Sequence, residues 1–218
     1  KPIVVVNKID RPDARIGDLP FKMLIDPSLK ALHSDPRWQK QVLEPIRKQF
    51  MAEKKVKDPG TAFALELIME EDQMMMMGDS LYWENLKPAG FVQKAFYDSL
   101  AIQQVNAVHR KKLLSILKPY AGKLPAPNLV GGEAITGVFL VVQHSNDLAY
   151  QKKWIQEFKN LLPHGRQYAE LYAMLSDRIC VLENKPQLYG TQWLNDHLYK
   201  CVSEEKLKKN RAAIHLSD

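Results

Sequence analysis

The chain of 218 residues is long enough for one full domain with a sizeable core, or for one domain with an appended segment. Hydrophobic residues make up 45% and charged residues 26% of the sequence, which argues against a disordered or fibrous chain. The 31 Lys and Arg against 25 Asp and Glu give a formal charge of +6, and the basic residues are spread out rather than clustered. This charge permits anionic partners but does not require them.

The cysteines and the apolar runs bear on the compartment. Cys180 and Cys201 are the only cysteines, with no CxxC pair and no Cys/His spacing typical of zinc, so the sequence predicts neither disulfides nor a metal site and leaves any cofactor unknown. The longest apolar run, Val138 to Val142, is far too short for a membrane span. We therefore expect a cytoplasmic protein without membrane contact. Because the chain begins at Lys1 rather than Met, secretion stays open.

Residues 1–16, KPIVVVNKIDRPDARI, predict a short buried strand followed by a loop. Their NKID segment closely resembles the base-recognition segment of translational GTPases of the TypA/BipA type, which implies Asn7, Lys8 and Asp10 as base-binding residues. The sequence contains neither a GxxxxGK(S/T) loop nor a DxxG segment, and nucleotide affinity depends mainly on such phosphate and metal contacts. GTP binding is therefore the lowest-ranked function for this segment, below a plain strand and turn.

Two Asp-Pro pairs, Asp26-Pro27 and Asp35-Pro36, predict helix starts in the next part of the chain. In each pair the Asp can accept hydrogen bonds from free N–H groups, while the Pro suits a first helical turn. We expect a short helix over 26–34 and a longer helix over 36–54, bent or broken at Pro45 because that residue lacks a backbone donor.

The charged stretch KKVKDPG, residues 54–60, predicts a boundary between an appended segment, 1–60, and a helical domain, 61–218. Within the domain, the apolar spacing predicts helices over 61–77, 94–117, 132–145, 147–162, 166–184 and 203–214. The helix over 132–145 is apolar on all sides, so we place it at the centre. The predicted fold class is mainly α: a helical bundle with a short N-terminal strand-and-loop segment.

Two details of these helices bear on the site. The first helix places Leu65, Ile68, Met69 and Asp72 on one face, so a carboxylate lies on an apolar stripe. The helix over 147–162 is expected to be capped by Ser145 or Asn146.

Four polar clusters interrupt the apolar faces, within the stretches MEEDQ, LVGGEAITGVFLVVQH, YAMLSDRI and KPQLYGTQW. In order and spacing, residues 64–218 resemble an uncharacterised bacterial family, domain of unknown function 6624. The family often has an Arg after EDQ, where this chain has MMMM at 74–77. The resemblance implies a common fold and directs attention to these polar residues, and it implies no particular reaction or substrate.

His144, Asp177 and Arg178 are the candidates for chemistry. His144 ends the most apolar helix, so its protonation is expected to depend on one neighbour, as a general acid or base requires; a hydrogen-bonded core histidine has the same sequence pattern. Asp177 and Arg178 are adjacent on a helix and diverge by about 100°, so each needs a different partner. We expect Asp177 to orient His144, and Arg178 to bind either Asp72 or an anionic ligand.

Amide and hydroxyl groups would position the ligand. In QLYGTQW the glycine permits a sharp turn, and the surrounding side chains offer several hydrogen-bonding groups. The predicted ligand-binding residues are Asp72, Gln73, Gln143, Arg178, Gln187, Tyr189, Thr191 and Gln192.

Two functional hypotheses follow. The first is an enzyme or binding domain for a small polar or anionic ligand, with His144 as acid or base. The second is a structural or protein-interaction module, in which the same polar residues form a buried network that fixes helix register. Mutually satisfied side chains without a cleft would favour the second hypothesis. Nucleic-acid binding ranks third, because HRKK and KLKKNR are typical of exposed helix faces.

Overall fold

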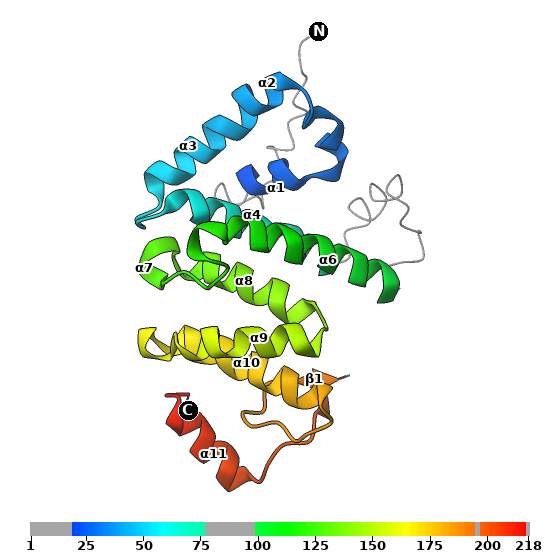
Figure 1. Cartoon of the computed structure of the whole chain (residues 1–218), viewed down its shortest axis with the longest axis vertical. Helices are drawn as coiled ribbons and strands as arrows, with labels where there is room; N and C mark the ends of the chain where they lie inside the picture. Colours follow the sequence, from blue (N-terminus) through cyan, green and yellow to red (C-terminus); the bar gives the residue numbers. More distant parts are fainter. Residues whose placement is uncertain (1–18, 77–98, 195–196, 217–218) are drawn as a thin grey trace, which may run out of the picture.

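The computed structural model describes residues 19–76, 99–194 and 197–216, and it confirms the prediction of a mainly α protein (Figure 1). The expected strand and loop at 1–16 lie outside the described residues. No helix in the described ranges is both long and apolar enough to cross a membrane. The longer helices are α4 (Pro59–Met76), α6 (Ser99–Ile116), α8 (Gly132–His144), α9 (Leu148–Lys159), α10 (Arg166–Leu182) and α11 (Glu204–Ala213).

The N-terminal part is more finely divided than the sequence predicted. The residues before Asp26 form a helix that the turn-rich sequence did not predict, and the helix expected over 26–34 is a 3-10 helix. The helix expected over 36–54 is interrupted by a π-helical segment that ends just before Pro45. The elements are α1 (Leu19–Ile25), η2 (Pro27–Leu32), α2 (Pro36–Trp38), η3 (Gln39–Leu43) and α3 (Glu44–Glu53).

Aromatic packing joins these N-terminal helices to α4. The ring of Phe21 lies 5.5 Å from that of Phe50 and 5.3 Å from that of Phe63, centroid to centroid, and Phe63 belongs to α4. Aromatic side chains at such distances bury large areas and add about 0.5–1.5 kcal/mol per pair beyond that burial. The chain therefore makes apolar contacts across the boundary that we expected near residue 60.

The main core lies among α4, α6, α8, α9 and α10, which follow one another down the long axis of the molecule in Figure 1. The central helix is α8, as its apolar sequence predicted, since residues on several of its sides are buried. Each fully buried Leu or Ile contributes about 1.5–3 kcal/mol relative to an exposed one. The buried α4 positions include Leu65, Ile68 and Asp72, so the predicted stripe with its carboxylate is confirmed.

The close crossing of α4 and α8 depends on Gly137. A Cβ atom at this position would overlap the carbonyl oxygen of Leu65 and would lie 3.1 Å from the Cβ of Met69. Glycine therefore lets the two backbones approach more closely than any other residue could. Two turns further along each helix, Asp72 of α4 meets His144 of α8. The two helices thus run parallel, and the crossing at Gly137 sets the register of the polar contact.

The C-terminal part packs on α10. Buried Ala169 and Ala173 of that helix share a second core with Tyr189, Ile214 and Leu216. A short antiparallel hairpin, which the sequence analysis did not predict, lies in the sequence between Tyr189 and Ile214 of this core. In it, β1 (Trp193–Leu194) pairs with β2 (His197–Leu198). The polar helix α11 has no buried residues, as expected for a surface helix.

The cap of α9 corrects one expectation. Asp147 caps this helix, and its side chain accepts a hydrogen bond from the Tyr150 amide at 3.0 Å. The predicted caps are displaced because Ser145 and Asn146 form the turn out of α8, where Asn146 adopts a φ of 49°.

Gly137→Ala should lower the free energy of unfolding by about 1–3 kcal/mol, because the added methyl group must push α4 and α8 apart. Urea unfolding measures the change. Gly60→Ala is the matched control: a Cβ there has no neighbour nearer than 3.6 Å, and helical Gly→Ala is neutral or stabilising. Equal stability of Gly137→Ala and the parent chain would contradict the register argument.

Candidate active site

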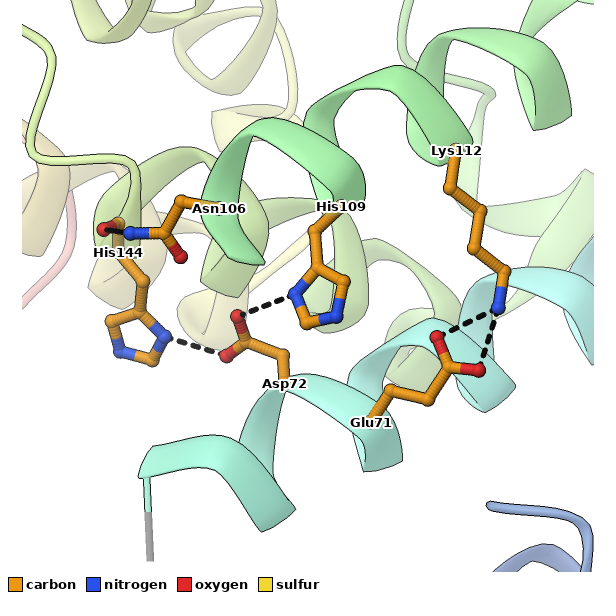
Figure 2. A network of polar contacts seen from close by, with 6 residues as sticks. All are labelled: Glu71, Asp72, Asn106, His109, Lys112 and His144. Carbon is orange, nitrogen blue, oxygen red and sulfur yellow. Dashed lines mark hydrogen bonds and ion pairs between the residues drawn. The ribbon is translucent and has the colours of Figure 1, made fainter. Parts of the chain in front are cut away.

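A buried carboxylate between two histidines forms the strongest candidate site (Figure 2). The side chain of Asp72 is completely buried, and its Oδ2 lies 2.5 Å from Nδ1 of His144. Its other oxygen, Oδ1, lies 3.5 Å from Nδ1 of His109. The two imidazoles differ in access to solvent, since the side chain of His109 is 4% exposed and that of His144 is 19% exposed.

Three helices supply one residue each to this cluster. Asp72 comes from the last part of α4, His109 from the middle of α6, and His144 from the last residue of α8. The end of α8 is also fixed from α6, because the Nδ2 of Asn106 donates to the backbone carbonyl oxygen of His144 at 2.5 Å. Since a helix end leaves carbonyl groups without partners, this bond holds the residue that carries the imidazole.

Burial and hydrogen bonding act in opposite directions on Asp72. Burial alone would raise the pKa of the Asp72 carboxyl, but the imidazoles of His109 and His144 together hold that pKa below its usual value. The carboxylate is therefore ionised; it is hydrogen-bonded to Nδ1 of His144 and faces Nδ1 of His109 at the longer distance of 3.5 Å. Because each ring directs its Nδ1 at an oxygen of Asp72, the cluster is arranged for proton positioning. Among the described residues, no group of three His, Cys, Asp or Glu side chains could hold a metal ion.

The charged neighbours of the cluster are paired with one another. Nζ of Lys112 lies 2.6 Å from Oε1 of Glu71, the residue before Asp72. Arg110 binds Asp147 with an Nη1–Oδ2 distance of 2.7 Å, and its guanidinium lies over the ring of Tyr150. These pairs, formed by residues that follow His109 in α6, fasten α6 to α4 and to the start of α9.

Asp177 organises the QLYGTQ loop. Its side chain is fully buried, and its Oδ1 accepts from the backbone N–H groups of Leu188 and Tyr189 at 2.7 and 3.0 Å. Its Oδ2 accepts from both the backbone N–H and the hydroxyl of Thr191, at 2.9 and 3.0 Å. Four donors on one buried carboxylate give a strong, charge-assisted attachment of the loop to α10.

Gln187 and Gln192 complete this loop network. The Oε1 of Gln187 accepts from the backbone N–H of Gln192 at 2.6 Å, and its Nε2 donates to the carbonyl oxygen of Tyr199 at 2.9 Å. The Nε2 of Gln192 donates to the carbonyl oxygen of Met174, in α10, at 3.3 Å. Both amides are buried and bind backbone groups, so they serve to fold the loop.

The side chains of the remaining predicted residues take no part in this loop network. Tyr189 is buried with its ring 6.0 Å from that of Tyr172, and burial raises the pKa of its hydroxyl. Arg178 donates from Nη2 to Oδ1 of Asn146 at 3.0 Å, so its guanidinium lies at the turn that follows His144. The side chains of Gln73 and Gln143, which neighbour Asp72 and His144 in sequence, are partly buried.

A separate charged cavity of ≈ 280 Å³ lies between the N-terminal helices, α4 and α8. Its Lys54 binds both Glu133 and Glu66, with Nζ 2.6 Å from the Glu66 Oε1, and the ammonium lies over the ring of Phe50. Burial raises the pKa of the Glu66 carboxyl despite this partner. The cavity thus holds an internal ion cluster that fastens the end of α3 to the domain, away from the two histidines.

A family model described as "Family of unknown function (DUF6624)" matches residues 68–211 of the chain. The chain belongs to this family. No curated protein and no solved structure matches the chain. The DUF6624 match includes the three residues of the Asp72 cluster and the loop organised by Asp177, and it leaves the N-terminal helices outside.

The structure joins some of the predicted site residues and separates others. It pairs Asp72 with His144, whereas the expected partner of His144, Asp177, directs both oxygens to the loop. Arg178 binds Asn146 rather than Asp72. Helical register between neighbouring helices decides these pairings, and periodicity within one helix does not contain that information.

His109 is the site residue that sequence reasoning missed in this DUF6624 domain. The HRKK stretch, which begins with His109, predicts an exposed basic helix face. A signal was available, because Val105, His109, Leu113 and Leu117 follow one another at intervals of four residues and are all buried. A histidine on the apolar face of a helix needs a polar partner inside the protein.

Asp177→Asn should destabilise the domain by about 3 kcal/mol, since one carboxylate oxygen is replaced by an NH₂ group facing N–H donors. Urea unfolding followed by circular dichroism measures the loss. Thr191→Val, which removes only the hydroxyl donor, is the graded control and should cost about 1 kcal/mol. Similar losses in both variants would show that the backbone donors contribute little.

Asp72→Asn should cost about 1–3 kcal/mol at pH 7, because the buried imidazole of His109 and the partly buried imidazole of His144 lose an ionised neighbour. The folded pKa of Asp72 lies below its unfolded value of about 3.9, so the carboxylate's contribution is present above that value and is lost as the pH falls through the folded pKa. Urea unfolding of both chains between pH 7 and pH 3 should show their difference shrinking below about pH 4. A difference that grows there would contradict an ionised Asp72.

Proposed function

We propose that Asp72 and His144 form the acid–base pair of a site for a small polar or anionic ligand. The observation that carries the proposal is the 2.5 Å contact between a fully buried carboxylate and the Nδ1 of an imidazole that is partly open to solvent. An Nδ1–H that donates to Asp72 leaves the lone pair of Nε2 free to take a proton. This is the base and orienting carboxylate arrangement of many enzymes that transfer protons.

Arg178 supports an anionic group on the ligand. Its guanidinium is held at Asn146, two residues after His144, and its Nε is buried without a hydrogen-bond partner in the described part of the chain. A buried guanidinium N–H favours a carboxylate or phosphate oxygen. In this division of roles, His144 exchanges a proton with the ligand, and Arg178 binds the negatively charged group of the ligand.

The loop residues act indirectly in this proposal. Asp177, Gln187, Thr191 and Gln192 bind one another and the backbone, which is typical of residues that hold a loop in place. We therefore assign them to holding α10, and hence Arg178, in place.

A protein-interaction module is the second proposal, and the hairpin favours it. Trp193 is 62% exposed, and the residue opposite it across the two strands, Leu198, is 40% exposed. Exposed Trp is common at contact sites. Nucleic-acid binding ranks lower because Arg110 and Lys112 of the basic stretch are paired with carboxylates.

A thermal-shift screen against phosphorylated metabolites, nucleotides, GTP with Mg²⁺, amino acids and other small carboxylates tests the first proposal. A ligand at a hundredfold excess over its dissociation constant stabilises the fold by about 2.7 kcal/mol. We expect an anionic hit whose stabilisation is lost in His144→Gln and in Arg178→Gln. Any hit is then incubated with the chain, and NMR follows its conversion.

His164→Gln is the matched control, because that histidine is exposed and lies on the segment between α9 and α10. It should bind the hit as the parent chain does. A hit that binds His144→Gln with unchanged affinity would place the ligand elsewhere. No stabilisation by any compound would favour the interaction module and direct the search to protein partners.

A further inference from the structure

We infer that His109 is a positioning residue of the proposed site: acting through Asp72, it keeps the proton of His144 on Nδ1 and thereby makes Nε2 the reactive atom. The inference deepens the proposed function, and the statement that Nε2 is the reactive atom rests on that function. The arrangement of protons that it describes can be measured without any ligand.

The geometry gives each oxygen of Asp72 one imidazole. Oδ2 is occupied by His144, and Oδ1 faces Nδ1 of His109 at 3.5 Å, which is long for a hydrogen bond. Both atoms of the longer contact are buried, and neither has a hydrogen-bond partner in the described ranges. Each is therefore the other's nearest polar complement, and a buried carboxylate oxygen needs a donor. The Nδ1–H tautomer of His109 supplies one.

The donor from His109 determines what Asp72 can do for His144. A carboxylate with a donor on each oxygen stays ionised and can only accept, so His144 must present Nδ1–H to it. If Oδ1 loses its donor, the buried negative charge of Asp72 loses part of its stabilisation, and the carboxylate takes a proton from solvent. The resulting carboxylic acid donates its O–H to Nδ1 of His144, and the single proton of the neutral imidazole then resides on Nε2 after exchange with water. In that state Nε2 is a donor and no longer a base.

Differences in burial separate the two histidines by role. The side chain of His109 is 4% exposed and lies within α6, whereas that of His144 is 19% exposed at a helix end. Only His144 has access to a ligand from solvent by this measure. Figure 2 shows that Nδ1 of His109 points at the carboxylate and that its ring lies on the side of Asp72 away from His144. His109 would therefore act on such a ligand only through Asp72.

Nitrogen-15 NMR of the intact chain with labelled histidine tests the inference at neutral pH. In the parent chain, both His144 and His109 should show a protonated Nδ1 and an unprotonated Nε2. In His109→Leu the two ring-nitrogen signals of His144 should exchange character, with loss of the Nδ1–H resonance. His109→Asn places an amide N–H close to the former Nδ1 and should restore the parent pattern, while exposed His164 stays unchanged throughout.

Two outcomes overturn the inference. The first is a parent chain in which Nδ1 of His109 carries no proton, which needs no variant and so does not depend on the folding of His109→Leu. The second is a His144 pattern that is the same in His109→Leu and His109→Asn, with native circular dichroism in both. Neither outcome touches ligand binding, so a failed inference and a failed site remain distinguishable: either outcome, found together with ligand binding that is lost in His144→Gln, would overturn the inference alone.

Discussion

The close parallel crossing of α4 and α8 is the constraint on which the polar centre depends. Gly137 allows the backbone of α8 to approach Leu65, and the shared helical repeat then carries Asp72 and His144 into contact two turns later. A wider crossing would separate the carboxylate from the imidazole while leaving each helix intact. The residue that permits this polar contact, Gly137, therefore carries no polar side chain.

Among the described residues, the two fully buried carboxylates, Asp72 and Asp177, have different surroundings. Asp177 receives four donors from a single loop, three backbone N–H groups and one hydroxyl group, and its capacity as an acceptor is used within the fold. Asp72 faces two imidazoles, which can carry a proton on either ring nitrogen, and one of them is partly open to solvent. Equal burial thus produces a fixed loop anchor in one case and a group suited to proton chemistry in the other.

Much of the fold could be predicted from local pattern, and most pairings could not. The apolar stripe of α4 and the all-apolar sequence of α8 correctly placed Asp72 inside the core and α8 at the centre, because burial follows from periodicity within one helix. Which carboxylate meets His144 depends on the register between helices, which periodicity does not specify. The same limit explains Arg178, whose partner Asn146 adopts a left-handed turn conformation with no clear sequence signal.

His109 shows how the interpretation of a segment can hide a residue. Together with the charged residues that follow it, His109 predicts a basic surface. Together with Val105 and Leu113, it predicts a buried histidine that needs a hydrogen-bond acceptor. The second grouping makes a buried histidine and a buried aspartate on neighbouring helices a natural pair, and it adds a third helix to the centre. Because α4, α6 and α8 each hold one member of the cluster, a ligand that changes the proton on His144 would also change the electrostatic contact between all three helices.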